Sequence, residues 1–208
     1  MLVIQKFVVN PLEECTYILH DDAREAIIVD CGALYDEEKE NIIRYVDEHQ
    51  LKVVAHLLTH SHFDHIFGAD FVYQQYGVKP SMHKAELLTY EQAASQMRSF
   101  VGNAFQLIVP PVGQLFDDDD QVKCGNHILG VVPTPGHTQG GVCYYCESEN
   151  ILLSGDTLFY RSIGRTDLFG GDYATLIKSI KHRLFCLPPS TKVYPGHGPS
   201  TTIGEESR

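Results

Sequence analysis

The segment 59–65 holds the densest group of side chains that could do chemistry, and its letters THSHFDH contain the pattern HxHxDH. It follows the apolar run 53–58, which predicts a strand buried on both faces. In an extended loop, the first two histidines can point at one position while the aspartate and the last histidine point at a neighbouring one. Imidazole and carboxylate groups are common ligands of divalent metal ions. This loop alone could therefore supply ligands to two metal ions that lie close together.

Three more potential ligands follow other expected strands, each directly after a glycine. They are His137 in PGHT after the apolar run 128–132, Asp156 in SGDT after 151–153, and His197 in PGHG after 192–194. Glycine permits a sharp exit from a strand and a close approach of the backbone to a site. Together with HxHxDH, these positions predict one shared site at an edge of the sheets. The other histidines are expected at element ends or on helices, mostly in solvent: His20, His49, His56, His83, His127 and His182.

Apolar periodicity predicts the elements that would position these groups. Strands are expected at 2–9, 15–20, 26–30, 53–58, 121–132, 141–146, 151–153 and 192–194. Helices are expected at 36–49, from the HxHxDH loop to about residue 76, at 83–105 and at 173–184. Strand-rich segments that are each followed by helices suggest two similar halves, with sheets inside and helices outside. We therefore expect an α/β (α+β) protein that forms a single domain over residues 1–208.

Composition and charge exclude several classes of protein. Hydrophobic residues make up 43% of the chain and charged residues 21%, which excludes a largely disordered protein. A formal net charge of −11 without a basic run argues against nucleic acid or anionic membranes as partners. No signal peptide or membrane span is recognisable. The six cysteines are scattered, and Cys143 and Cys146 form a CxxC in a strand-like segment, where they would face opposite sides. Free thiols in a cytoplasmic protein are expected.

The order HxHxDH, Gly-His, Gly-Asp and a last Gly-His resembles the metallo-β-lactamase-fold superfamily over nearly the whole chain. This resemblance implies a four-layer αββα sandwich, which agrees with the two halves described above. It also implies two metal positions, with His60, His62 and His137 at one, Asp64, His65 and His197 at the other, and Asp156 bridging them. All seven ligand positions of the family are present. The resemblance therefore implies two divalent ions, with zinc as the first choice and iron or manganese as alternatives.

Three branches of this superfamily fit the sequence poorly. True β-lactamases are usually exported, and they lack the second histidine of the loop together with the bridging aspartate. This chain has both residues, and no signal peptide is recognisable. RNA-processing nucleases carry a large inserted domain, for which 208 residues leave no room. The flavin-linked diiron oxygen reductases need a flavodoxin domain, which is not recognisable in this sequence.

The stretches 155–159 and 163–167, GDTLF and IGRTD, resemble a short form of the glyoxalase II branch, without its C-terminal helical domain. That branch consists of thioesterases that act on hydroxyacyl-glutathione. The resemblance implies a thioesterase in which Asp64, Asp156 and Arg165 act in catalysis. Two cations would lower the pKa of a water and polarise the thioester carbonyl, and Arg165 would grip a substrate carboxylate. A structural ion pair is the alternative role of Arg165. The chain has Arg165 where the long enzymes have lysine and Asp167 where they have tyrosine. The identity of the thiol in the substrate therefore stays open.

Other functions fit the same motifs. The Gly-Arg-Thr-Asp stretch is equally similar to the persulfide dioxygenases, in which His60, His137 and Asp156 would hold one iron. A lactonase is a further hydrolase option. A metal-stabilised interaction module is disfavoured, because the ligands lie at strand ends rather than in a closed cysteine-rich cage. The expected partner is a small-molecule thioester, and the expected assembly is a monomer or a small homo-oligomer.

Overall fold

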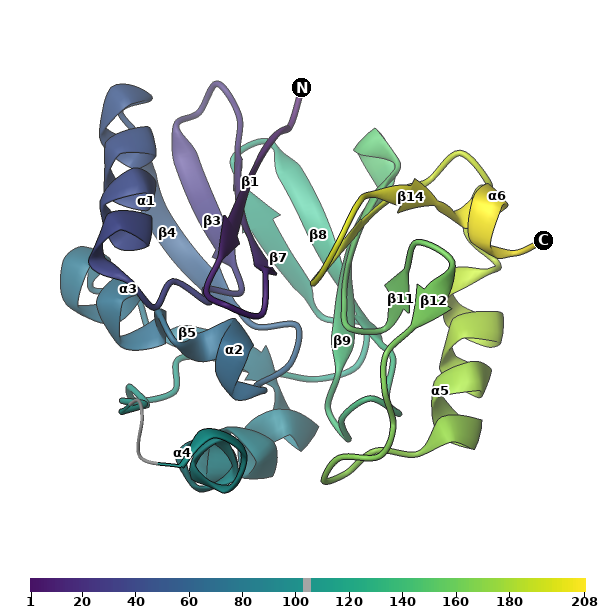
Figure 1. Cartoon of the computed structure of the whole chain (residues 1–208). Helices are drawn as coiled ribbons and strands as arrows, with labels where there is room; N and C mark the ends of the chain where they lie inside the picture. The colour runs from purple at the N-terminus through teal and green to yellow at the C-terminus, as the bar shows by residue number, and fades with distance from the viewer. Residues whose placement is uncertain (103–105) are drawn as a thin grey trace.

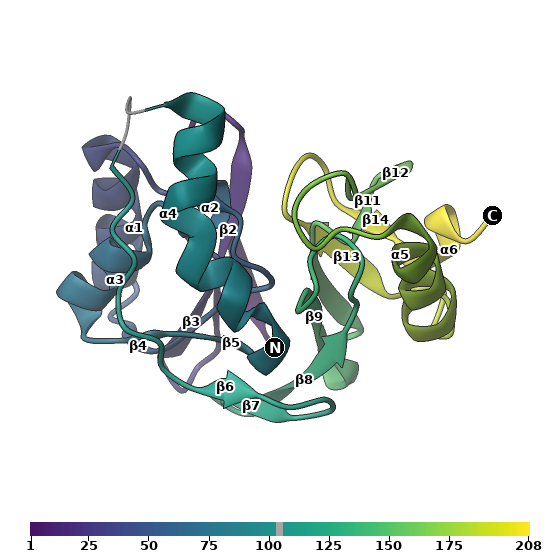
Figure 2. The same cartoon turned by 90° about the horizontal axis from the view of Figure 1, so that it is seen from below.

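The chain folds into four layers, in which two β-sheets lie face to face between two layers of helices (Figure 1). The computed structural model describes residues 1–102 and 106–208. Seen from below, the sheets form two walls, and each has helices on its outer side (Figure 2). The αββα sandwich implied by the resemblance is confirmed. No helix in the described ranges is both long and apolar enough to cross a membrane.

Six strands from the first part of the chain form one sheet, ordered as they occur in the sequence. They are β1 (Val3–Val9), β2 (Glu14–His20), β3 (Glu25–Val29), β4 (Lys52–Leu57), β5 (Pro80–His83) and β6 (Leu115–Phe116). The first three form the expected antiparallel meander, whereas β3 to β6 run parallel. Helices α1 (Asp36–Glu48) and α3 (Ala69–Tyr76) cover the outer face. Ile42 and Val72 on these helices pack in one apolar cluster with Ile28 of β3.

The second sheet has the strand order β14-β13-β10-β9-β8-β7. Its strands are β7 (Gln121–Cys124), β8 (His127–Pro133), β9 (Val142–Cys146), β10 (Ile151–Gly155), β13 (Lys192–Pro195) and β14 (Thr201–Thr202). Helix α5 (Tyr173–Ser179), its π-helical continuation (Ile180–Leu184) and α6 (Ile203–Glu206) cover the outer face. β10 and β13 run parallel, so their carboxyl ends meet at one edge of the sheet.

The main core lies between the two sheets, where Leu19 and Ile27 of the first sheet pack with Leu129 of the second. Side chains alternate along β9, which places Cys146 in this core and Cys143 in the layer under α5. The two cysteines of the CxxC therefore point away from each other. All six cysteines are free, as the sequence predicts.

Two stretches of the fold differ from the sequence-based expectation. The expected strand 121–132 is a hairpin of β7 and β8, because Gly125 and Asn126 form a two-residue turn between them. Gly125 has a φ of 55°, a conformation that glycine adopts readily. The loop that carries HxHxDH ends in the one-turn helix α2 (Phe63–Ile66), so it is only partly extended.

The expected helix 83–105 starts later than the sequence suggests. A 3₁₀ turn (Lys84–Glu86) separates β5 from helix α4 (Leu87–Val101), and the end of the expected helix, at 103–105, lies outside the described residues. Tyr90 of α4 packs in one apolar cluster with α2. α4 therefore lies beside the HxHxDH segment and can shape the surroundings of the site.

Three of the histidines expected in solvent are buried instead: His20, His56 and His83. His20 shares a hydrogen bond with the Tyr45 hydroxyl, and His83 with the Asp118 carboxylate. His56 of β4 is completely buried, and neither of its ring nitrogens has a well-aligned hydrogen-bond partner. It pairs with Ile28 of β3, which packs against the helices, and so it faces the helical layer. The apolar pattern of the strand does not indicate that a histidine is buried there.

We expect His56→Leu to raise the free energy of unfolding by about 1–2 kcal/mol near neutral pH, because leucine replaces a buried imidazole whose ring nitrogens lack a well-aligned partner in this apolar layer. Burial lowers the pKa of His56 to about 3, from about 6.5 in the unfolded chain. As the pH falls below 6.5, the unfolded chain takes up the proton first, so the stability of the wild type drops. This loss reaches about 2 kcal/mol at about pH 5.

Urea unfolding near neutral pH and at about pH 5 checks this prediction, with the exposed His182→Leu as the matched control. The stability gap between His56→Leu and the wild type should widen on acidification, and the control should show no such change. An equal gap at both pH values would contradict the prediction.

Candidate metal centre

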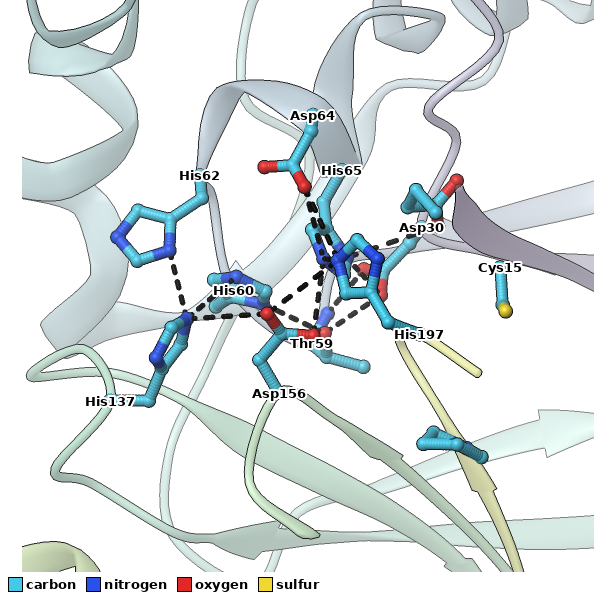
Figure 3. A network of polar contacts seen from close by, with 12 residues as sticks. Cys15, Asp30, Thr59, His60, His62, Asp64, His65, His137, Asp156 and His197 are labelled. Atoms are coloured by element: carbon cyan, nitrogen blue, oxygen red, sulfur yellow. Dashed lines mark hydrogen bonds and ion pairs between the residues drawn. The ribbon is translucent and has the colours of Figure 1, made fainter. Parts of the chain in front are cut away.

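All seven predicted ligands come together at the edge where the two sheets meet (Figure 3). The HxHxDH segment follows β4, and His137, Asp156 and His197 follow β8, β10 and β13. Gly155, with a φ of 47°, lets the chain turn sharply out of β10 directly before Asp156. The order strand, glycine, ligand thus brings together residues that are far apart in the sequence.

Three imidazoles form the first cluster, which consists of His60, His62 and His137. The Nε2 atom of His137 lies 2.9 Å from His62 Nδ1 and 3.2 Å from His60 Nε2. All three side chains are buried. Neutral ring nitrogens at such separations need a proton or a cation between them, and a divalent ion bound by three imidazoles meets this need.

The second cluster contains Asp64, His65 and His197. His197 Nε2 lies 3.3 Å from both Asp64 Oδ2 and His65 Nε2. His197 is the most exposed of the three, with 26% of its side-chain surface accessible, whereas His65 is completely buried. This cluster therefore opens toward solvent on the His197 side.

Asp156 lies between the two clusters. Its Oδ1 atom is 3.3 Å from His65 Nε2, and its Oδ2 atom is 3.6 Å from His137 Nε2 and 3.7 Å from His197 Nε2. Oδ1 is buried but lacks a well-aligned hydrogen-bond partner among the described residues. One carboxylate thus reaches both clusters, which is the arrangement that a bridging ligand requires.

The charge states favoured at the first cluster and at Asp156 are those that metal binding requires. Burial lowers the pKa of His62 to about 3 and holds the pKa of His60 well below its usual value, so both imidazoles keep a free lone pair. Burial by itself raises the pKa of Asp156. The charges of His65, His137 and His197 outweigh this effect and keep the carboxylate ionised. Burial by itself lowers the pKa of His65 and His197, but the surrounding carboxylates outweigh it and raise the pKa of both, so a metal ion at the second cluster would displace their protons.

Hydrogen bonds from the Nδ1 atoms orient most of the histidines. His65 donates from Nδ1 to Asp30 Oδ2 at 3.0 Å, His137 to the Arg165 carbonyl at 2.7 Å, and His197 to the Leu12 carbonyl at 3.0 Å. Each bond leaves Nε2 free to face the centre, as is usual for metal-binding histidines. The backbone of Arg165 thus holds His137 in place, whatever its side chain does.

Asp30 is a functional neighbour that the sequence analysis did not single out. Its carboxylate accepts hydrogen bonds from the Thr59 backbone and hydroxyl, both at 2.7 Å, besides the bond from His65. Glu14 lies on the same side, 3.8 Å from His65 Nδ1. The stretch Asp30-Cys31-Gly32 directly follows β3, so a carboxylate and a glycine at a strand end were the available signal.

Glu86 is a second neighbour that the sequence analysis missed. Its completely buried carboxylate accepts hydrogen bonds from the Ser61 backbone and hydroxyl, the Thr138 hydroxyl and the Gly140 backbone, at 2.7–3.0 Å. Burial raises the pKa of Glu86 to about 7, although these donors favour the ionised form. Glu86 thus ties the HxHxDH segment to the loop that carries His137. No local pattern in the sequence marks it.

A cavity of about 420 Å³ leads to the two clusters. Besides candidate ligands, its wall includes Arg165 and several apolar side chains. The Arg165 guanidinium binds the Asp167 carboxylate through two hydrogen bonds of 2.7 Å, and both side chains are more than half exposed. The predicted role of Arg165 toward a substrate carboxylate stays a prediction.

Comparison with known sequences gives one matching family and several long relatives. A model of the metallo-beta-lactamase superfamily matches residues 12–202. The chain is 36% identical to the probable metallo-hydrolase YqgX of Bacillus subtilis, over 94% of this chain and 90% of the relative. It is 31% identical to the hydroxyacylglutathione hydrolase GloC of Haemophilus influenzae, over 96% of this chain and 92% of the relative.

Similar solved structures cover nearly the whole chain. The BLEG-1 B3 metallo-beta-lactamase superposes with a TM-score of 0.89 at 37% identity, covering 98% of this chain and 96% of that one. TTHA1623 in a di-iron-bound form has a TM-score of 0.85 at 31% identity, covering 98% and 97%. ETHE1 from Myxococcus xanthus has a TM-score of 0.77 at 26% identity, covering 99% and 82%.

Proposed function

The chain belongs to the metallo-beta-lactamase superfamily, and from this premise we propose that it is a hydrolase that uses two divalent metal ions to cleave a thioester. The observation that carries the proposal is the position of Asp156, with one oxygen 3.3 Å from His65 and the other 3.6 Å from His137. A carboxylate placed between two sets of ligands is suited to bridge two ions. The similarity to a probable metallo-hydrolase and to a hydroxyacylglutathione hydrolase supports hydrolysis and a glyoxalase II type of substrate.

The proposed division of labour assigns each group of residues a task. Divalent ions at the two clusters would acidify a water and polarise the thioester carbonyl. His60, His62 and His137 would hold one ion, Asp64, His65 and His197 would hold the other, and Asp156 would contact both. Asp30 keeps His65 in the tautomer that offers Nε2. A thiolate with a pKa of about 8.5 leaves with little help from a general acid, which suits a site whose titratable groups are used as ligands.

Metal analysis and a thioester assay test the proposal together. We expect about two ions per chain, with zinc, iron and manganese measured in parallel because a di-iron-bound structure is among the similar ones. We also expect hydrolysis of acyl thioesters that a chelator abolishes and added metal restores. Turnover that survives complete removal of metal would contradict the proposal.

An iron persulfide dioxygenase is the second candidate, favoured by the closeness of His60, His137 and Asp156. His137 Nε2 lies 3.2 Å from His60 Nε2 and 3.6 Å from Asp156 Oδ2, so these residues could act as three ligands of one iron with open positions. One iron per chain, with oxygen uptake on a persulfide and no thioester turnover, would establish this reaction instead. A lactone and a β-lactam belong in the same panel, the latter because a B3 metallo-beta-lactamase is among the similar structures.

A further inference from the structure

The cavity in front of the two clusters has a mostly apolar wall. Its apolar side chains come from four separate segments, namely Leu12 after β1, Phe63 on α2, Phe100 and Val101 at the end of α4, and Leu168 after the hairpin of β11 (Leu158–Phe159) and β12 (Ser162–Ile163). Leu12 and Phe100 are 50% and 56% exposed. These two side chains of the cavity wall are thus open to solvent, and an apolar group of a bound substrate could cover them.

The one basic side chain of the wall outside the candidate ligands already has an acidic partner. Arg165 supplies the one guanidinium or ammonium group among the described residues of this wall. Two of its five N–H donors, one on Nε and one on Nη2, are engaged by the Asp167 oxygens at 2.7 Å, which is the side of the guanidinium that a second carboxylate would need for the same two-point contact. Asp167 is joined to Arg165 through a single intervening residue, so it is always at hand to compete with an incoming carboxylate.

We propose that this cavity selects thioesters whose acyl and thiol groups are uncharged and apolar, and that Asp167 enforces the choice by occupying Arg165. The inference rests on the proposed thioesterase function and narrows its substrate class to thiols without a carboxylate, which departs from the acyl-glutathione that the glyoxalase II resemblance implies. It assigns Asp167 the role of a specificity-determining residue. It also gives the Arg165–Asp167 pair a task other than holding a substrate carboxylate.

The physical reason lies in desolvation. A carboxylate that enters an apolar cavity loses water and must find a charged partner in exchange. Here the Arg165 guanidinium is already paired with Asp167, so a substrate carboxylate gains little binding free energy from it. An alkyl group, in contrast, gains from each methylene that it removes from water between Leu12, Phe63 and Phe100.

Matched thioesters separate these effects. The hexanoyl thioester of N-acetylcysteamine has an uncharged thiol, and that of mercaptopropionate has a carboxylate on a thiol of similar size. With the metal-loaded wild type, we expect kcat/KM to be at least about ten-fold higher for the uncharged one. Lengthening the acyl group from acetyl to hexanoyl on N-acetylcysteamine should raise kcat/KM about three-fold per methylene.

Variants then test the role of Asp167. Asp167→Ala should raise the ratio of kcat/KM for the carboxylate substrate over the uncharged one by about ten-fold, mainly through a lower KM. Adding Arg165→Ala to this variant should cancel the gain, because the freed guanidinium causes it. The control is Glu147→Gln, which removes the same charge from an exposed position outside this wall and should leave the ratio unchanged.

The outcomes distinguish this inference from the proposed function. If no thioester is turned over, the proposed thioesterase function is ruled out. A higher kcat/KM for the carboxylate substrate, or a kcat/KM that does not depend on acyl length, would overturn the inference. The proposed thioesterase function would still be supported. An unchanged ratio in Asp167→Ala would likewise remove the role of Asp167.

Discussion

Asp156→Ala is expected to lower kcat for thioester hydrolysis by about 10³-fold and to leave fewer than two metal ions per chain. Asp156 is the one described side chain whose oxygens lie within 4 Å of histidines from both clusters. Without it, the two ions would lose the anion that they share, and the positive charges would repel each other. The variant should therefore lose the metal pair rather than substrate affinity alone.

The measurement combines metal analysis with steady-state kinetics on one thioester. Asp22→Ala is a suitable control, because Asp22 is an exposed aspartate whose side chain accepts a hydrogen bond from Asn126 in the β7–β8 turn, away from the site. It should keep both ions and full turnover. Asp156→Asn, which keeps one oxygen but not the charge, should fall between the wild type and the alanine variant. Two ions and full turnover in Asp156→Ala would refute the bridged arrangement.

The site was predictable where its chemistry is local in the sequence. Four of its candidate ligands lie within six consecutive residues, 60–65, and three others directly follow a glycine at a strand end. Such patterns survive without knowledge of the fold, because the loop or the strand end itself aims the side chains. The two-layered sheet arrangement followed from the same alternation of apolar runs and helices.

The residues that hold the ligands in place were not predictable in this way. Glu86 contacts Ser61, Thr138 and Gly140, which lie 25, 52 and 54 positions away. Only the folded chain brings these partners together. His56 was wrongly expected in solvent for a related reason, since a single polar residue in an apolar strand gives no sign of which side it faces. The β7–β8 hairpin, in contrast, had a local signal in its Gly-Asn turn.

Glu86→Ala is expected to lower the free energy of unfolding by about 3–5 kcal/mol, because four buried donors lose their acceptor at once. The backbone of Gly140 lies so close to Glu86 that a side chain at 140 would collide with it, so the two loops have little room to rearrange. Glu86→Gln keeps the shape of the side chain but turns an amide toward these donors. It should retain part of the stability.

The same substitutions are expected to act on the metal site through geometry. Ser61 stands between His60 and His62, and Thr138 follows His137, so Glu86 contacts neighbours of every ligand in the first cluster. We expect the affinity of the first metal position to fall about 10–100-fold in Glu86→Gln, under conditions in which the variant is fully folded. Metal titration with a competing chelator measures this affinity, and denaturant unfolding measures stability separately. If Glu86→Gln lost stability but bound metal as tightly as the wild type, Glu86 would support the fold without positioning the ligands. A loss of affinity in the folded variant would show that the buried carboxylate sets the spacing of the three imidazoles.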